Sequence, residues 1–215
     1  MRPNYAQDAP PTSIEVGGFA YPCNTDYRVW LEVVRLLREI DLRDESEAGR
    51  QRAAETLVEI ERIVFGGWLK DESPMDVLAA VADFSKGYPM APIQDTGDSR
   101  EPAYSFEYDL NAIIIAIRNQ SGIDLSWRRT EPFHWWEFLL EFHTLCGNHY
   151  ILNLMEARTY RGKDRDLLRR KYACQLPPEY TAAERAELED FSAQFATGWE
   201  ALEETMEEDR HEDRY

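Results

Sequence analysis

The first regular pattern in the chain is an alternation of apolar and polar residues at 13–22, SIEVGGFAYP. The alternation continues on both sides of Gly17-Gly18. Because a Gly-Gly pair tolerates the positive φ angles of a two-residue turn, the pattern predicts a short β-hairpin. A lone hairpin is marginal in water, so we expect this one to pack against another element.

From residue 24 onward, apolar residues recur every three to four positions, which is the period of an amphipathic helix. The first such stripe predicts a helix that is capped by Asn24 or Thr25 and ends near Ile40. Ser46, the Ser73-Pro74 pair and Gly66-Gly67 are further helix start and stop signals. Together these patterns predict six more helices, at about 46–65, 74–84, 106–119, 130–145, 149–157 and 163–173.

The segment 106–119 is the ambiguous one, because its isoleucines are β-branched and weaken helix propensity. A strand is the alternative there. The preceding EYDLNA and the terminating RNQSG favour the helix.

Proline and glycine divide the chain into three parts. Residues 1–12 read as a flexible N-terminal arm, and 13–176 as a single helical domain in which 87–102 is a loop or linker. Residues 177–215 read as an acidic, helical C-terminal extension, with apolar positions scattered among many Glu residues. The predicted fold is therefore mostly α, with about six to eight helices and a short N-terminal β-hairpin.

Composition narrows the class of protein. The 215 residues include 43% apolar ones, enough for a buried core, and a net charge of -17. That charge argues against a nucleic-acid binder and against attachment to an anionic membrane surface. The longest apolar run, Ala112 to Ile117, is far too short to span a bilayer. Three cysteines without framework spacing fit reduced thiols, so we expect a soluble intracellular protein.

Charge is unevenly distributed along the chain. Residues 179–215 hold 13 acidic and 3 basic side chains, whereas residues 158–171 hold 7 basic and 2 acidic ones. Solvated helix faces are the ordinary explanation. The alternatives are that the two segments attract each other, or that the acidic one keeps the protein in solution.

No motif in the sequence indicates an enzyme, a metal centre or a cofactor. His143, Cys146 and His149 are spaced by three, which spreads them over roughly 120° of a helix, and a fourth zinc ligand is missing. There is no nucleophile elbow, phosphate-binding loop or dinucleotide fingerprint. Glu137 and Glu141 lie one turn apart, as on a solvated face, and His134 is typical of a packed or interfacial imidazole. We therefore predict no catalytic residue.

The densest feature is an aromatic cluster within FHWWEFLLEF: Phe133, Trp135, Trp136, Phe138 and Phe142. On a helix these residues cover a wide apolar arc. One interpretation is a helix at the centre of the core. The other is that part of the arc is exposed as a groove for an apolar partner segment, because aromatic residues anchor interfaces. Both can hold at once.

Four blocks of sequence then resemble one known family, in the right order. They are SIEVGGFAYPCNTDYRVWLE, YSFEYDLNAIIIAIRNQSGIDL, FHWWEFLLEFHTL and, more loosely, the basic segment 160–173. They are similar to the bacteriophage gene-product-fifteen family, in which a hairpin precedes N-T-D-[FY]-R-x-W, a helix ends at G-I-D-L and a later helix carries H-W-W-[KE]-F. The resemblance covers roughly 13–176 and departs at both ends and in the 87–102 loop.

The resemblance implies a non-enzymatic protein from a siphophage-type tail module, similar to a tail assembly chaperone. Such a chaperone coats the long, apolar, helical tape-measure protein until tail-tube subunits replace it. The implied partners are thus phage tail proteins, above all the tape-measure protein, with a homo-oligomer left open and no nucleic acid or membrane. The implied location is the host bacterial cytoplasm, and the chain is expected to be absent from the mature virion. The alternative is a structural tail or connector protein that stays in the virion.

Overall fold

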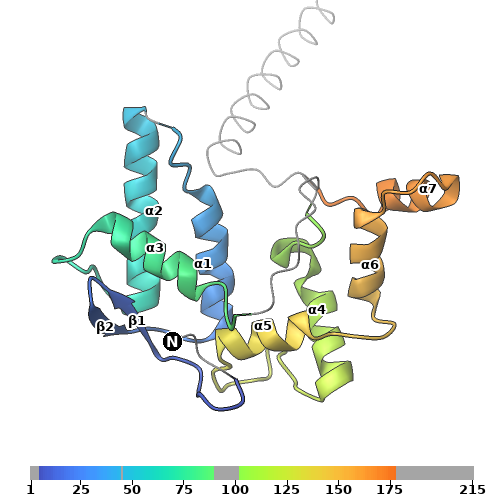
Figure 1. Ribbon diagram of the computed structural model, residues 1–215, viewed down its shortest axis with the longest axis horizontal. Coiled ribbons are helices and arrows are strands. Elements are labelled where there is room, and N and C mark those ends of the chain that lie inside the picture. Colours follow the sequence, from blue (N-terminus) through green and yellow to red (C-terminus); the bar gives the residue numbers. More distant parts are fainter. Residues whose placement is uncertain (1–4, 45, 90–101, 178–215) are drawn as a thin grey trace, which may run out of the picture. The chain divides into compact units, whose positions relative to one another are not determined.

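The computed structural model describes residues 5–44, 46–89 and 102–177. The chain divides into two compact units, residues 1–177 and residues 178–215, and the first unit contains every element described below (Figure 1). The predicted acidic extension falls almost entirely outside the described residues, as does most of the predicted 87–102 loop.

The described part of the chain is mostly helical, as the sequence predicts, and begins with a two-stranded antiparallel hairpin. The strands are β1 (Ser13–Val16) and β2 (Phe19–Pro22). Seven helices follow within the described ranges: α1 (Tyr27–Glu39), α2 (Glu47–Phe65), α3 (Pro74–Phe84), α4 (Phe106–Ser121), α5 (Trp135–His143), α6 (Tyr150–Thr159) and α7 (Arg165–Ala173).

The hairpin turns at the predicted Gly-Gly pair. Gly17 and Gly18 have φ angles of +57° and +88°, a region that only glycine enters without strain. Ile14 lies opposite Tyr21 in the ladder, and Ile14 and Val16 are buried. β1 packs against α3, so the hairpin finds the support that it needs in water.

The first helix begins later than predicted. Its N-cap is Asp26, whose carboxylate accepts a hydrogen bond from the Arg28 backbone N–H, rather than Asn24 or Thr25. The two earlier residues have other partners: the Asn24 side chain accepts from the Asp26 backbone N–H, and the Thr25 carbonyl accepts from the Trp135 N–H at 2.7 Å. The Asn24 side chain is therefore engaged before the helix begins, and the Thr25 backbone joins the segment that leads into α5.

The fifth helix is also shorter than predicted, because it begins at Trp135 rather than near Thr130. Residues before it pair with the segment that leads into α1. Asp26 and His134 form an isolated antiparallel bridge, and the Phe133 carbonyl accepts from the Tyr27 N–H at 2.8 Å. Because these backbone groups bond across the fold, they cannot form helical hydrogen bonds.

The remaining helices follow the sequence signals closely. Ser46 caps α2, which ends before Gly66 at a φ of +77°, as the predicted stop requires. α3 starts at Pro74, and α6 and α7 lie within two residues of their predicted limits. The ambiguous segment 106–119 is a helix and not a strand.

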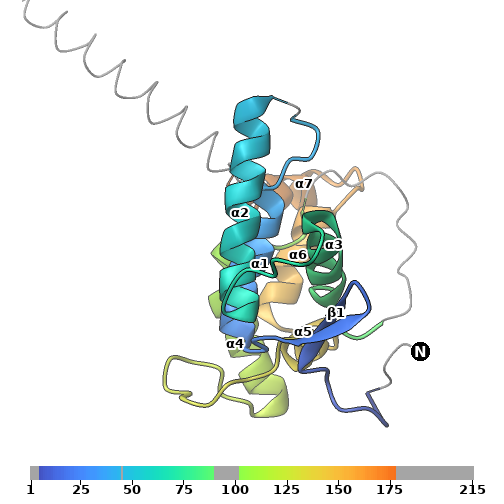
Figure 2. The same cartoon turned by 90° about the vertical axis from the view of Figure 1, so that its left-hand side faces the viewer.

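Buried side chains form one core cluster to which β1 and the helices α1 to α6 all contribute. α1 contacts α2 and α5, and α4 contacts α5 and α6, as Figures 1 and 2 let the reader follow. α7 contacts α6 and has no buried residue of its own. The largest fully buried side chains in the described ranges are Trp30, Trp135, Phe138, Ile60, Ile113, Ile117, Leu125 and Ile151.

Candidate functional site

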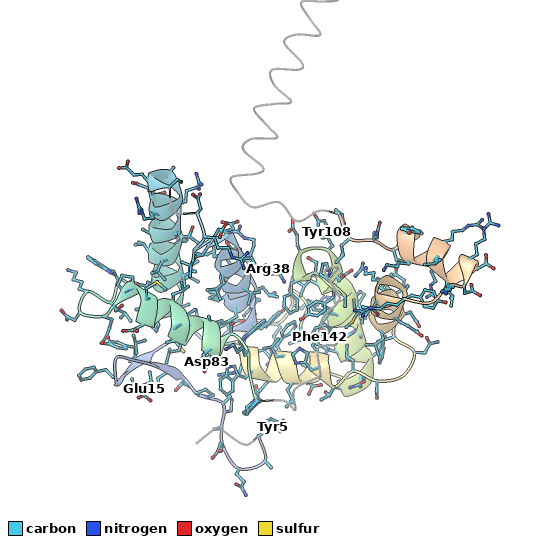
Figure 3. All side chains as sticks on the ribbon, turned by 45° about the horizontal axis from the view of Figure 1, so that its top comes forward. Tyr5, Glu15, Arg38, Asp83, Tyr108 and Phe142 are labelled. Carbon is cyan, nitrogen blue, oxygen red and sulfur yellow. The ribbon has the colours of Figure 1, made fainter. Side chains whose placement is uncertain are left out.

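The aromatic cluster that we predicted as a partner-binding surface lies on α5 and just before it. Four of its members are buried, with exposed fractions of 7% or less: Trp135, Trp136, Phe138 and Phe142. Phe133 is partly buried against the same core. Figure 3 labels Phe142 amid the side chains close to α4 and α5. Four of the five side chains are thus not exposed, and whether a partner contacts the cluster stays a prediction.

The indole groups of this cluster make contacts within the chain. Trp135 Nε1 donates to the Ser85 carbonyl oxygen at 2.9 Å, and Trp136 Nε1 donates to the Phe84 carbonyl oxygen at 2.8 Å. The Phe84 ring in turn stacks on Trp30, with ring centroids 4.6 Å apart. α5 is only nine residues long and is covered by α1, α4 and the end of α3. The buried side chains of its wide apolar arc therefore pack against these neighbours.

His134 is the N-cap of α5 and has a structural role. Its Nδ1 accepts from the Trp136 backbone N–H at 3.0 Å, so the proton is on Nε2, which lies 2.9 Å from the Pro11 carbonyl oxygen. Burial lowers the pKa of the imidazole, although the Pro11 carbonyl and the charge of Glu137 both raise it. A neutral imidazole bonded at both nitrogens positions the chain before β1 and has no free atom for acid–base chemistry.

The other candidate chemistry does not converge. The Glu141 carboxylate accepts a hydrogen bond from the Ser121 hydroxyl on α4. Over the ranges that the structure describes, no three His, Cys, Asp or Glu side chains gather closely enough to hold a metal ion. No helix within those ranges is long and apolar enough to cross a membrane.

A groove of about 660 Å³ lies between α4, α6 and the segment that follows α7. Three large side chains along it are strongly exposed: Tyr108 by 45%, Ile115 by 49% and Tyr150 by 69%. Figure 3 labels Tyr108 at the N-terminal part of α4. The apolar part of the lining consists of Tyr108, Ala112, Ile115, Ala116, Tyr150, Leu154, Ala173, Leu176 and Pro177.

The groove exists because α4 is apolar on two faces. Ile113 and Ile117 point into the core. Tyr108 and Ile115 are seven residues apart and lie on a second face, which lines the groove as far as Asn119. At a rise of about 1.5 Å per residue, this wall is about 16 Å long, or about three helical turns.

A buried ion pair lies in the lining of this groove. Arg158 on α6 donates to both carboxylate oxygens of Asp109 on α4, at 2.6 and 3.1 Å. The same guanidinium donates to the carbonyl oxygens of Cys174, at 2.7 Å, and Ala103, at 3.1 Å. Asp109 also accepts from the Ser105 backbone N–H. The pair therefore joins α4, α6 and the wall after α7.

The charged surface of α7 and of the segment before it is positive on balance, although Asp164 and Asp166 are also exposed there. Five basic residues at the start of α7 and along it are exposed: Arg161, Lys163, Arg165, Arg169 and Arg170. None of these five side chains forms an ion pair with a residue that the structure describes. α7 leads directly into the third wall of the groove, which begins at Ala173.

Sequence reasoning missed this site, although two signals pointed toward it. The isoleucine run of α4 covers more of the helix than one core-facing stripe needs, which was a sign of a second apolar face. The basic segment 158–171 was recognised only as a charge run. Nothing in that run distinguishes Arg158, which is buried, from its exposed neighbours.

Comparison with known proteins gives one match. The family model described as "Bacteriophage Gp15 protein" matches residues 7–181. That family indicates a phage structural or morphogenesis protein. No protein of curated function and no solved structure matches the chain.

Proposed function

This chain belongs to the bacteriophage Gp15 family, and from that premise we propose that it is a tail assembly chaperone. Its target is the tape-measure protein, whose apolar helical segments it shields in the host cytoplasm before the tail tube forms. The chain itself carries out no chemical reaction, and it leaves before the virion is complete.

The single observation that carries this proposal is the groove between α4, α6 and the segment after α7. Its wall along α4 has the length of about three helical turns, and Tyr108, Ile115 and Tyr150 are exposed along it. An amphipathic helix that lays its apolar face into such a groove is a common mode of recognition. We place the contact in the groove because the groove is exposed, whereas most of the aromatic cluster of α5 is buried; partner contact by that cluster stays an untested prediction.

The size of the groove suits a contact that must be released. A contact with a wall of about three helical turns is small beside an obligate interface, which buries about 2,000–5,000 Å². Many copies bound along one long target gain avidity without strong individual contacts. Each copy can then be displaced singly when tail-tube subunits arrive.

The test is a pull-down of the tagged chain from phage-producing cells, with mass spectrometry of the eluate and of purified virions. We expect tape-measure peptides in the eluate and none of this chain in virions. Stoichiometric presence in virions would overturn the proposal and identify a structural tail or connector protein, which is the alternative.

A matched pair of variants tests the groove itself. Ile115 on α4 and Val58 on α2 are both β-branched and exposed, by 49% and 54%. We expect Ile115→Glu to deplete tape-measure peptides from the eluate, because it puts a charge in the groove. Val58→Glu makes the same kind of change away from the groove and should leave recovery unchanged. Equal recovery with both variants would remove the groove from the proposal.

A further inference from the structure

The lining of the groove has almost no net charge. Its only charged side chains are Asp109 and Arg158, which neutralise each other. The remaining polar lining consists of amides, a thiol and an imidazole: Asn111, Asn119, Asn148, Gln175, Cys174 and His149. α7 adjoins the groove at Ala173, and Arg169 and Arg170 lie about one helical turn before that residue.

α7 has the composition of a contact surface. It exposes Leu167 by 42% and Tyr172 by 66% among its arginines. Arg165 and Arg169 are four residues apart and so lie on one face of the helix. Arginine and tyrosine are enriched at interfaces, and a helix with no buried residue does not hold them for the sake of the core.

We propose that α7 selects the occupant of the groove by charge. The preferred occupant is an amphipathic helix that carries Asp or Glu along the flank that faces α7. Arg165, Arg169 and Arg170 pair with those carboxylates while the apolar stripe of the helix packs on Tyr108, Ile115 and Tyr150. This inference rests on the proposed function, because it specifies the chemistry of the segment that the groove binds.

A carboxylate-bearing helix fits better than nucleic acid. The whole chain carries a net charge of -17, which repels a long polyanion over most of its surface. A short helix with a few carboxylates meets only the local positive charge, because charges beyond about 8 Å are largely screened at physiological ionic strength.

The experiment uses the full chain and three synthetic helical peptides of about five turns. All three share one leucine stripe, and their flanking positions are all Glu, all Gln or all Lys. Fluorescence anisotropy gives each dissociation constant at low and at physiological salt. We expect the Glu peptide to bind most tightly and the Lys peptide most weakly. The differences between the dissociation constants should be smaller at physiological salt than at low salt. The net charge of the chain alone predicts the opposite order, so the result discriminates.

Charge-reversal variants locate the effect. We expect the double variant Arg165→Glu with Arg169→Glu to raise the dissociation constant of the Glu peptide about ten-fold. Each exposed ion pair contributes a factor of about 1.5 to 5 in affinity, and repulsion between the new glutamates and the peptide adds to the loss. The Gln peptide should bind this variant as it binds the unmodified chain. Arg43 and Arg50 are exposed and lie outside the lining of the groove, so Arg43→Glu with Arg50→Glu is the matched control and should leave all three constants unchanged.

The failures of the two proposals look different. Equal binding of the Glu and Lys peptides, with both weakened by Ile115→Glu, overturns charge selection but leaves the groove as a helix-binding site. Absence of binding by all three peptides overturns charge selection and the groove as a helix-binding site, whereas the chaperone role is overturned only by the pull-down. Efficient competition by a short DNA duplex overturns the preference for a helix and makes α7 a nucleic-acid surface.

Discussion

Trp135 is the residue whose replacement tests most directly whether the aromatic cluster belongs to the core. Its side chain is 1% exposed and stacks on Phe138 with ring centroids 5.5 Å apart. We expect Trp135→Ala to lower the free energy of unfolding by about 3–5 kcal/mol, because a large buried side chain leaves a cavity. Urea denaturation followed by circular dichroism measures the change.

Trp127 is the matched control, since 87% of its surface is exposed. Its replacement by alanine should change stability by no more than about 0.5 kcal/mol. A Trp135→Ala protein with unchanged stability and lost partner binding would contradict the core assignment. The predicted binding role of the aromatic cluster would then regain its support.

The second prediction for single residues concerns the buried ion pair of Arg158 and Asp109. Removal of the guanidinium by Arg158→Met leaves the Asp109 carboxylate buried and uncompensated, and we expect a loss of about 3–5 kcal/mol. Adding Asp109→Asn removes the orphaned charge and keeps an acceptor for Ser105, so the double variant should recover part of the loss.

The comparison for this pair is an exposed ion pair on α2. Arg62 bonds to Glu59 at the surface, and Arg62→Ala should leave the denaturation midpoint nearly unchanged in the same experiment. If the double variant is as unstable as Arg158→Met alone, the uncompensated carboxylate charge of Asp109 is not the cause of the lost stability.

Single residues also show where sequence reasoning ends. The pattern of α5 fits a buried helix and an exposed one equally well, because periodicity records which residues share a face but not what covers that face. Only the neighbouring helices decide that Trp136 is inside. Arg158 shows the same limit, since its buried partner Asp109 is 49 residues away in the sequence.

At the scale of elements, start and stop residues in the sequence predicted the limits of a helix correctly where those limits depend on local chemistry. Ser46 and Gly66 mark the limits of α2 as predicted, because a cap and a left-handed stop are local chemistry. The starts of α1 and α5 were misplaced, because Thr25 and Phe133 use their backbone groups to join two segments far apart in the chain. No local sequence pattern indicates tertiary pairing of this kind.

The cap of α5 yields a prediction on pH. Burial holds the pKa of His134 below its ordinary value of 6.5. The unfolded chain therefore binds more protons than the folded one between pH 6.5 and that lowered pKa, so stability is lost as the pH falls through this window. Asn is a good N-cap without a titrating group, and His134→Asn should make the unfolding free energy less sensitive to pH below 6.5.

Denaturant titrations of both proteins at a series of pH values from neutral to mildly acidic measure this difference. At neutral pH the variant should be somewhat less stable, because Asn does not reach the Pro11 carbonyl as Nε2 of His134 does. If the two curves stay parallel as the pH falls, protonation of His134 does not oppose folding.

At the scale of the whole molecule, the fold class and the family were predictable from the sequence, whereas the groove was not. The hairpin, the helical periods and the ordered motifs each occupy a continuous stretch, so they can be recognised without a structure. The groove needs Tyr108, Tyr150 and Leu176 to meet from three separate segments. Their meeting depends on the packing of α4 on α6 and of α6 on α7.

The last prediction concerns the two units of the chain. Every core residue in the described ranges lies between Ile14 and Ala157, whereas residues 179–215 hold 13 acidic and 3 basic side chains. We expect a protein ending at Pro177 to keep its melting temperature within about 2 °C in scanning calorimetry, since the hydrophobic core is intact. Its solubility should fall, because most of the net charge is gone. A drop of more than about 5 °C would mean that residues 178–215 contribute to the stability of the folded chain.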